Sequence, residues 1–198
     1  PETATKAHPG KIQGVTFAGG EELYQIAQDM ANMLREDEGC NYVICLGHLG
    51  IDDETAATGN RSIDLLNKVT GIDVFIDGHS HSTIAMELVK NKDGKEIPLS
   101  STGTKLVNIG KLTISDGVFT TELVSDYAAK DDTTDVFVKS IQEKNEALVN
   151  TVVARTSVDL TTKHSDGTRA IRNRETNLGD LCADAYRAVS GADIALVN

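Results

Sequence analysis

Two short stretches of the sequence end an apolar run in residues that could bind a metal ion. Residues 72–76 are rich in Ile, Val and Phe, and they lead into Asp77-Gly78-His79-Ser80-His81. Imidazole is the commonest metal ligand in proteins, and two histidines that are two residues apart in extended chain point to the same side. His79 and His81 are therefore candidate ligands for one ion or for two neighbouring ions.

The same pattern occurs earlier in the chain, where the apolar residues 42–46 lead into Gly47 and His48. Residues 60–71 between the two stretches read as a helix, with Asn60 as the candidate N-cap. A strand, a helix and a strand of this length normally form a right-handed parallel crossover, so both Gly-His turns lie at one edge of a sheet. We expect His48, His79 and His81 to converge there, because neighbouring strands are only about 4.8 Å apart.

The rest of the chain predicts further helices and strands around this unit. Apolar residues at helical spacing predict helices over 21–38, 134–150 and 174–191, and β-rich runs predict strands at 84–89, 96–101, 106–114, 118–124, 152–160 and 192–197. Asn-Lys-Asp-Gly at 91–94 and Ser-Asp-Gly at 115–117 are hairpin signals. The predicted fold class is α/β, with a partly antiparallel mixed sheet and helices outside it.

Composition narrows the classes of function. The chain has 198 residues and a formal net charge of -11, which argues against a nucleic-acid partner because such binding depends on Lys and Arg neutralising phosphates. No apolar run approaches the ~20 residues needed to span a bilayer. The three cysteines have no C-x-x-C spacing, so they predict neither a disulfide framework nor a zinc knuckle.

Several other residues that could do chemistry have ordinary explanations. His8 precedes a proline in a polar stretch, and His164 lies in a predicted turn, so neither is a favoured ligand. The carboxylates at 52–54 lie in a long loop and read as a solvated surface. Met30 and Met33 read as core residues of the first helix.

Four blocks of the sequence resemble the bacterial 5′-nucleotidase family. They are Gly-His-Leu-Gly at 47–50, Asp-Gly-His-Ser-His-Ser at 77–82, the segment 1–6 with 14–17, and the segments 174–181 and 191–198. The resemblance covers nearly the whole chain. It implies part of a four-layer α/β/β/α metallophosphoesterase sandwich at 1–132, a linker helix at 133–150, and the start of a second α/β domain, for substrate recognition, at 151–198.

The resemblance also implies a two-metal phosphohydrolase that releases phosphate from nucleotides. Residues matching His48 and His79 bind one divalent ion, zinc, manganese or similar, and the residue matching His81 binds the other. Two such ions about 3.5–4 Å apart clamp the phosphate and activate water. Asp77 orients a ligand imidazole or serves the turn structurally. The substrate is a small nucleotide, and the family resemblance favours an extracytoplasmic location, whereas free thiols alone favour a reducing compartment.

The family blocks that carry the remaining ligands and the catalytic histidine are not found in this sequence. The expectation is an internal fragment that contains no catalytic residue and is inactive by itself. Three alternatives stay open. The parent protein could hydrolyse 2′,3′-cyclic nucleotides, nucleotide sugars or sulfur-containing substrates; three histidines could make a mononuclear zinc site; or the chain could be a non-catalytic structural or binding piece. The sequence leaves the oligomeric state undetermined.

Overall fold

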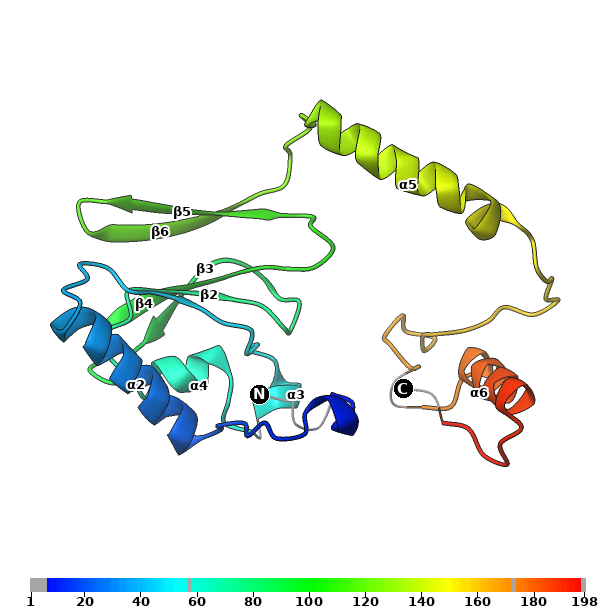
Figure 1. Ribbon diagram of the computed structural model, residues 1–198, viewed down its shortest axis with the longest axis horizontal. Helices are drawn as coiled ribbons and strands as arrows, with labels where there is room; N and C mark the ends of the chain where they lie inside the picture. Colours follow the sequence, from blue (N-terminus) through cyan, green and yellow to red (C-terminus); the bar gives the residue numbers. More distant parts are fainter. Residues whose placement is uncertain (1–6, 57, 172–173, 197–198) are drawn as a thin grey trace. The chain divides into compact units, whose positions relative to one another are not determined.

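The structure, a computed structural model, describes residues 7–56, 58–171 and 174–196 (Figure 1). Two features of the sequence lie partly outside them: the family-like block at 1–6, and the end of the last predicted strand at 197–198. The chain divides into two units, one ending at Ala129 and the other beginning at Lys130. The predicted division into domains at 1–132, 133–150 and 151–198 stays a prediction.

The elements follow the predicted order through most of the chain. The first unit contains η1 (Pro9–Lys11), α2 (Glu21–Glu36), β1 (Ile44–Leu46), α3 (Asp53–Ala56), α4 (Ser62–Leu66), β2 (Val74–Asp77), β3 (Thr83–Lys90), β4 (Glu96–Thr102), β5 (Ile109–Ser115) and β6 (Val118–Val124). The second unit contains α5 (Asp132–Asn150) and α6 (Asn177–Ser190).

The main sheet of the first unit is mixed, with strand order β1-β2-β4-β3. β1 and β2 are parallel, β2 and β4 are parallel, and β3 and β4 form an antiparallel hairpin. β5 and β6 pair separately as a second antiparallel hairpin. The predicted α/β class and both predicted hairpins are therefore confirmed.

Successive side chains of β2 point to opposite faces of the main sheet and pack against different elements. Phe75 is fully buried in the core with residues of α2 and α4, among them Ala31 and Leu66. The next residue, Ile76, points to the opposite face of the strand, where it lines a small space together with Leu112 of β5. Figure 1 shows the helices on one side of the main sheet and the β5–β6 hairpin on the other.

A buried carboxylate fixes the start of the parallel strand pair. Asp73 is 8% exposed, and its carboxylate accepts hydrogen bonds from the Arg35 guanidinium and, at 3.0 Å, from the Val43 amide. Arg35 also donates to the carbonyls of Gly71 and Asn41. Because α2, β1 and β2 are tied together at this end, the opposite, carboxyl ends of β1 and β2 are held in register.

The helix between β1 and β2 differs from its prediction at both ends. α4 covers only Ser62–Leu66, and its N-cap is Arg61, not Asn60. Arg61 and Asp64 form reciprocal cap interactions, and the hydrogen bonds that the Arg61 guanidinium donates to the Asp64 carboxylate raise the pKa of Arg61. The Asn60 side chain instead accepts a hydrogen bond of 2.7 Å from the Gly20 amide, so tertiary contact decides its role.

Two predicted strands of the second unit are wrong. The described residues of 152–160 and 192–196 form no strand, and Val153 is 90% exposed. A strand requires a neighbour to pair its backbone N–H and C=O groups. Near these segments the described structure has only the isolated bridge between Lys163 and Arg169. A high content of β-branched residues was therefore not enough to make these segments strands.

Exposure corrects one further prediction, for the first helix. Met30 is exposed on the surface of α2, so its predicted core role is wrong, and Met33 is half-buried. Within the described residues, no helix has the length and apolar character that crossing a membrane requires.

Candidate metal site at two Gly-His turns

The two Gly-His turns lie side by side because the strands that precede them are paired. In the parallel register of β1 and β2, Leu46 faces Ile76. The Gly47 amide then donates a hydrogen bond of 2.9 Å to the Ile76 carbonyl, which extends the pairing by one residue. At both turns the backbone leaves the sheet at the carboxyl ends of the strands, the position where open α/β sheets bind ligands.

Each turn places its histidine over the glycine of the other turn. A Cβ added at Gly78 would lie 2.9 Å from His48 Nδ1, and a Cβ added at Gly50 would lie 3.1 Å from His79 Cδ2. The two imidazole rings contact each other edge to face, with their centroids 5.2 Å apart. Any side chain at either glycine would therefore push the histidines apart.

The backbone at the second turn is unusual for the residues it carries. His79 has φ of 78° and His81 has φ of 56°, both in the left-handed region. L-residues other than glycine rarely adopt this conformation, and such residues cluster at functional sites where the surrounding structure holds them. This conformation re-aims the two side chains, so the simple rule that alternate residues share one side does not apply here.

The buried floor of the site is formed by Phe75. Its ring lies against Gly47, where an added Cβ would come within 2.5 Å of Cζ. The side chain is fully buried, so the turn that carries His48 rests directly on the core. Gly47 is thus required for close approach rather than for a left-handed backbone.

Asp77 connects the two turns through its carboxylate. Oδ1 accepts hydrogen bonds from the amides of Leu49 (2.9 Å) and Gly50 (3.3 Å), and Oδ2 accepts one of 2.6 Å from Ser62 Oγ. Of the two roles that the sequence left open for Asp77, these contacts favour the structural one. Sequence reasoning missed Ser62; its only signal was a small polar residue near the start of a helix.

The structure brings two of the three predicted ligands together. His48 and His79 are in contact, whereas His81, in the same β2–β3 connection as His79, is exposed. Within residues 7–56, 58–171 and 174–196, no three His, Cys, Asp or Glu side chains form a group that could hold one ion. The expected convergence of all three histidines on one cluster is therefore not found among the described residues.

The separation of the His48 and His79 rings is the one expected for two imidazoles bound to one divalent ion. Two imidazoles bound to one tetrahedral ion through bonds of about 2.1 Å have ring centroids about 5 Å apart. The observed separation between His48 and His79 is 5.2 Å. His48 is exposed and His79 half-buried, so the pair is open to solvent on at least one side.

Cys45 lies one strand residue before the first turn and is not a nucleophile candidate. It packs half-buried against the core. Burial, with a smaller contribution from the charge of Asp77, raises the pKa of the Cys45 thiol from 9.0 to about 11. The thiol is therefore protonated near neutral pH, and a thiolate is the form that attacks or binds metal.

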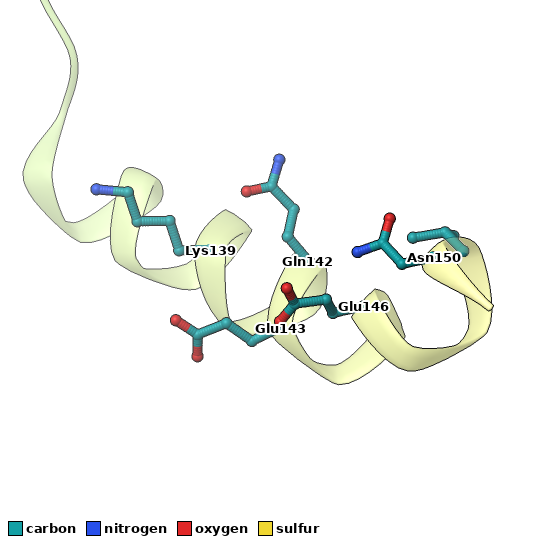
Figure 2. Close-up of a pocket in the computed structure, with 6 residues that line it drawn as sticks. Lys139, Gln142, Glu143, Glu146 and Asn150 are labelled. Atoms are coloured by element: carbon teal, nitrogen blue, oxygen red, sulfur yellow. The ribbon is translucent and has the colours of Figure 1, made fainter.

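A hollow on the second unit carries no comparable chemistry. Figure 2 shows Lys139, Gln142, Glu143, Glu146 and Asn150 spread along α5. All of its lining residues come from this one helix, so the hollow lies between neighbouring surface side chains of α5. We do not assign it a function.

The first unit is a mixed α/β unit, and its mixed sheet is consistent with part of a metallophosphoesterase-like fold. No protein-family model matches the chain. Over its whole length the chain is similar to the trifunctional nucleotide phosphoesterase protein YfkN of Bacillus subtilis (strain 168), with 28% identity over 211 residues. The chain spans only 13% of the length of that protein. The similarity confirms the resemblance to the bacterial 5′-nucleotidase family.

Proposed function

We propose that this chain provides part of the two-metal site of a nucleotide phosphohydrolase of the 5′-nucleotidase type. The observation that carries the proposal is the reciprocal packing of the two Gly-His turns, which puts the His48 and His79 rings 5.2 Å apart at the carboxyl edge of the sheet. The Bacillus subtilis relative is named a nucleotide phosphoesterase, which supports the same class of reaction for this chain.

Each histidine has a proposed role. His48 and His79 hold one divalent ion, zinc, manganese or similar, and His81 contributes to a second. Such ions, when bound, supply Lewis acidity toward a phosphoryl oxygen and activate water for attack. Phe75 and Asp77 do not touch the phosphate; they keep the two histidine-bearing turns rigid, which lowers the entropic cost of assembling the site.

The substrate within this class is a separate question. The relative is named a trifunctional nucleotide phosphoesterase, and this name does not single out one nucleotide ester. The candidates are therefore 5′-nucleotides, 2′,3′-cyclic nucleotides and nucleotide sugars. We also propose that the 198-residue chain alone does not turn over AMP. Two ions with about four ligands each need more donors than these three imidazoles provide.

Metal binding by the chain tests the proposal. Isothermal titration calorimetry with Mn²⁺ or Zn²⁺ is expected to show binding that His79→Ala weakens by 10-fold or more, since this variant removes one of the two histidines that meet within the described residues. The matched control is His164→Ala, because His164 lies in a turn of the second unit. Equal loss of affinity in both variants, or absence of binding by the unaltered chain, would contradict the proposed site.

The same chain can be assayed for phosphate release from AMP and from 2′,3′-cyclic AMP. Turnover by the 198 residues alone would overturn the proposed inactivity while leaving the reaction class intact. A chain with neither stoichiometric metal nor hydrolysis would instead support the alternative of a non-catalytic structural or binding piece. Location outside the cytoplasm is proposed on the resemblance alone.

A further inference from the structure

Ser62 is the first residue of α4, and its side chain lies completely buried beneath the first Gly-His turn. Its Oγ donates to Asp77 Oδ2 at 2.6 Å and lies 3.2 Å from the Gly50 carbonyl. The Ser62 amide donates to the same Gly50 carbonyl at 3.0 Å. Ser62 thus contacts both the carboxylate that joins the two turns and the end of the turn that carries His48.

We infer that Ser62 is a positioning residue for the metal-binding histidines, an inference that rests on the proposed function. Asp77 precedes His79 by two residues, and its Oδ1 holds the amides that follow His48. The orientation of this single carboxylate therefore sets the relative position of both histidines. Ser62 fixes that orientation from the side of α4.

Burial explains why Ser62 can hold the Asp77 carboxylate in one orientation. Asp77 is 8% exposed and Ser62 0% exposed, so water cannot replace the serine hydroxyl without a rearrangement. Hydrogen bonds to a carboxylate are shorter and stronger than neutral ones. If the hydroxyl is removed, Oδ2 is left without its buried donor, and the carboxylate is expected to rotate away from the amides of Leu49 and Gly50.

The chain offers a closely matched control in Ser101. Ser101 faces Asp77 in the register between β2 and β4 and is 2% exposed. Within the described residues its Oγ has no hydrogen-bond partner. Ser62→Ala and Ser101→Ala therefore each remove one buried serine hydroxyl near Asp77. Of the two hydroxyls, the one of Ser62 is hydrogen-bonded to the Asp77 carboxylate.

The test compares these two variants in the full 198-residue chain by NMR without metal and by Mn²⁺ titration. Without metal, Ser62→Ala is expected to speed amide hydrogen exchange at Leu49 and Gly50 at least 10-fold and to weaken the cross-peaks between the His48 and His79 rings. Ser101→Ala is expected to leave both unchanged. Groups that bond a metal ligand directly typically contribute about 10–100-fold in metal affinity. Ser62 acts through Asp77 and the turn amides, so Ser62→Ala is expected to weaken Mn²⁺ binding by less than this, and Ser101→Ala is expected to leave it unchanged.

Ser62→Cys covers the case in which the alanine variant does not fold. The thiol fills similar space but is a weak donor, so exchange at Leu49 and Gly50 should again increase. Unchanged exchange and unchanged ring cross-peaks in a folded Ser62 variant, or equal changes in Ser101→Ala, would overturn the inference. If exchange changes as expected but no chain binds Mn²⁺, the positioning role stands and the proposed function fails.

Discussion

The two units of the chain carry similar amphipathic helices but use them differently. In the first unit, α2 and α4 bury Tyr24, Ala31, Leu65 and Leu66 against the sheet. In the second unit, none of the residues of α5 and α6 is buried. Helical periodicity therefore produced helices in both units, and a core only where a sheet offers a complementary apolar face.

The same contrast holds for charged groups. Asp73 in the first unit is nearly buried and is held by Arg35 and the Val43 amide. In the second unit Asp131 is exposed and Asp135 is half-buried, and their contacts are with α5 and its flanking residues. The Thr134 backbone and side chain lower the pKa of Asp131, and Lys139 and Lys130 lower the pKa of Asp135. Carboxylates organise tertiary structure in one unit and helix ends in the other.

The largest expected effect comes from matched truncations of phenylalanine. Phe75→Ala is expected to lower the free energy of unfolding of the first unit by about 3–5 kcal/mol, because it leaves a cavity in a closed core. Phe137→Ala replaces a residue that is 64% exposed on α5, so it should change the free energy of unfolding by less than about 0.5 kcal/mol. Urea unfolding followed by circular dichroism measures both, and similar losses would mean that the second unit has a core of its own.

Replacing one positively charged side chain in each unit tests the difference between their carboxylates. Arg35→Met is expected to destabilise the first unit by about 2–3 kcal/mol, because the guanidinium bonds to a buried carboxylate and to backbone carbonyls. Lys139→Met, which removes an exposed partner of Asp135, should leave the unfolding curve unchanged. An unaffected midpoint for Arg35→Met would contradict the assigned role of the Arg35–Asp73 pair.

The smallest expected effect is a pH dependence of the first unit. Because the folded-state pKa of Cys45 is raised to about 11, the unfolded chain releases this proton at a lower pH than the folded chain. The stabilising contribution is therefore complete below pH 9 and is lost as the pH rises through about 11. Thermal unfolding between pH 8 and 11 should show a steeper decline than in Cys45→Ala; identical slopes would exclude this assignment.

The elements that sequence predicted well are those with local determinants. Helix α2, both hairpins and α6 follow from periodicity and turn residues. α6 ends with Gly191 as its C-cap, as expected, but it begins three residues after its predicted start, with Thr176 as N-cap. The failures have non-local causes. The segment at 152–160 has strand composition, but it pairs with no other strand within the part of the chain that the structure describes. The Asn60 side chain accepts a hydrogen bond from the Gly20 amide and does not cap α4.

For the candidate site, the sequence by itself predicted which residues could bind metal and that His48, His79 and His81 would converge at one edge of the sheet. Among the described residues, the structure brings His48 and His79 into contact but does not gather all three. Tertiary structure alone decided three further points. His81, with a left-handed backbone like that of His79, does not join the other two histidines. The Asp77 carboxylate binds the amides of the first Gly-His turn. Ser62, from α4, donates a hydrogen bond to the same carboxylate. The hydrogen bond between Leu49 and Asp77, 28 positions apart, depends on the pairing of β1 with β2. The one between Ser62 and Asp77, 15 positions apart, depends on where the first residue of α4 lies. No local sequence pattern encodes either arrangement.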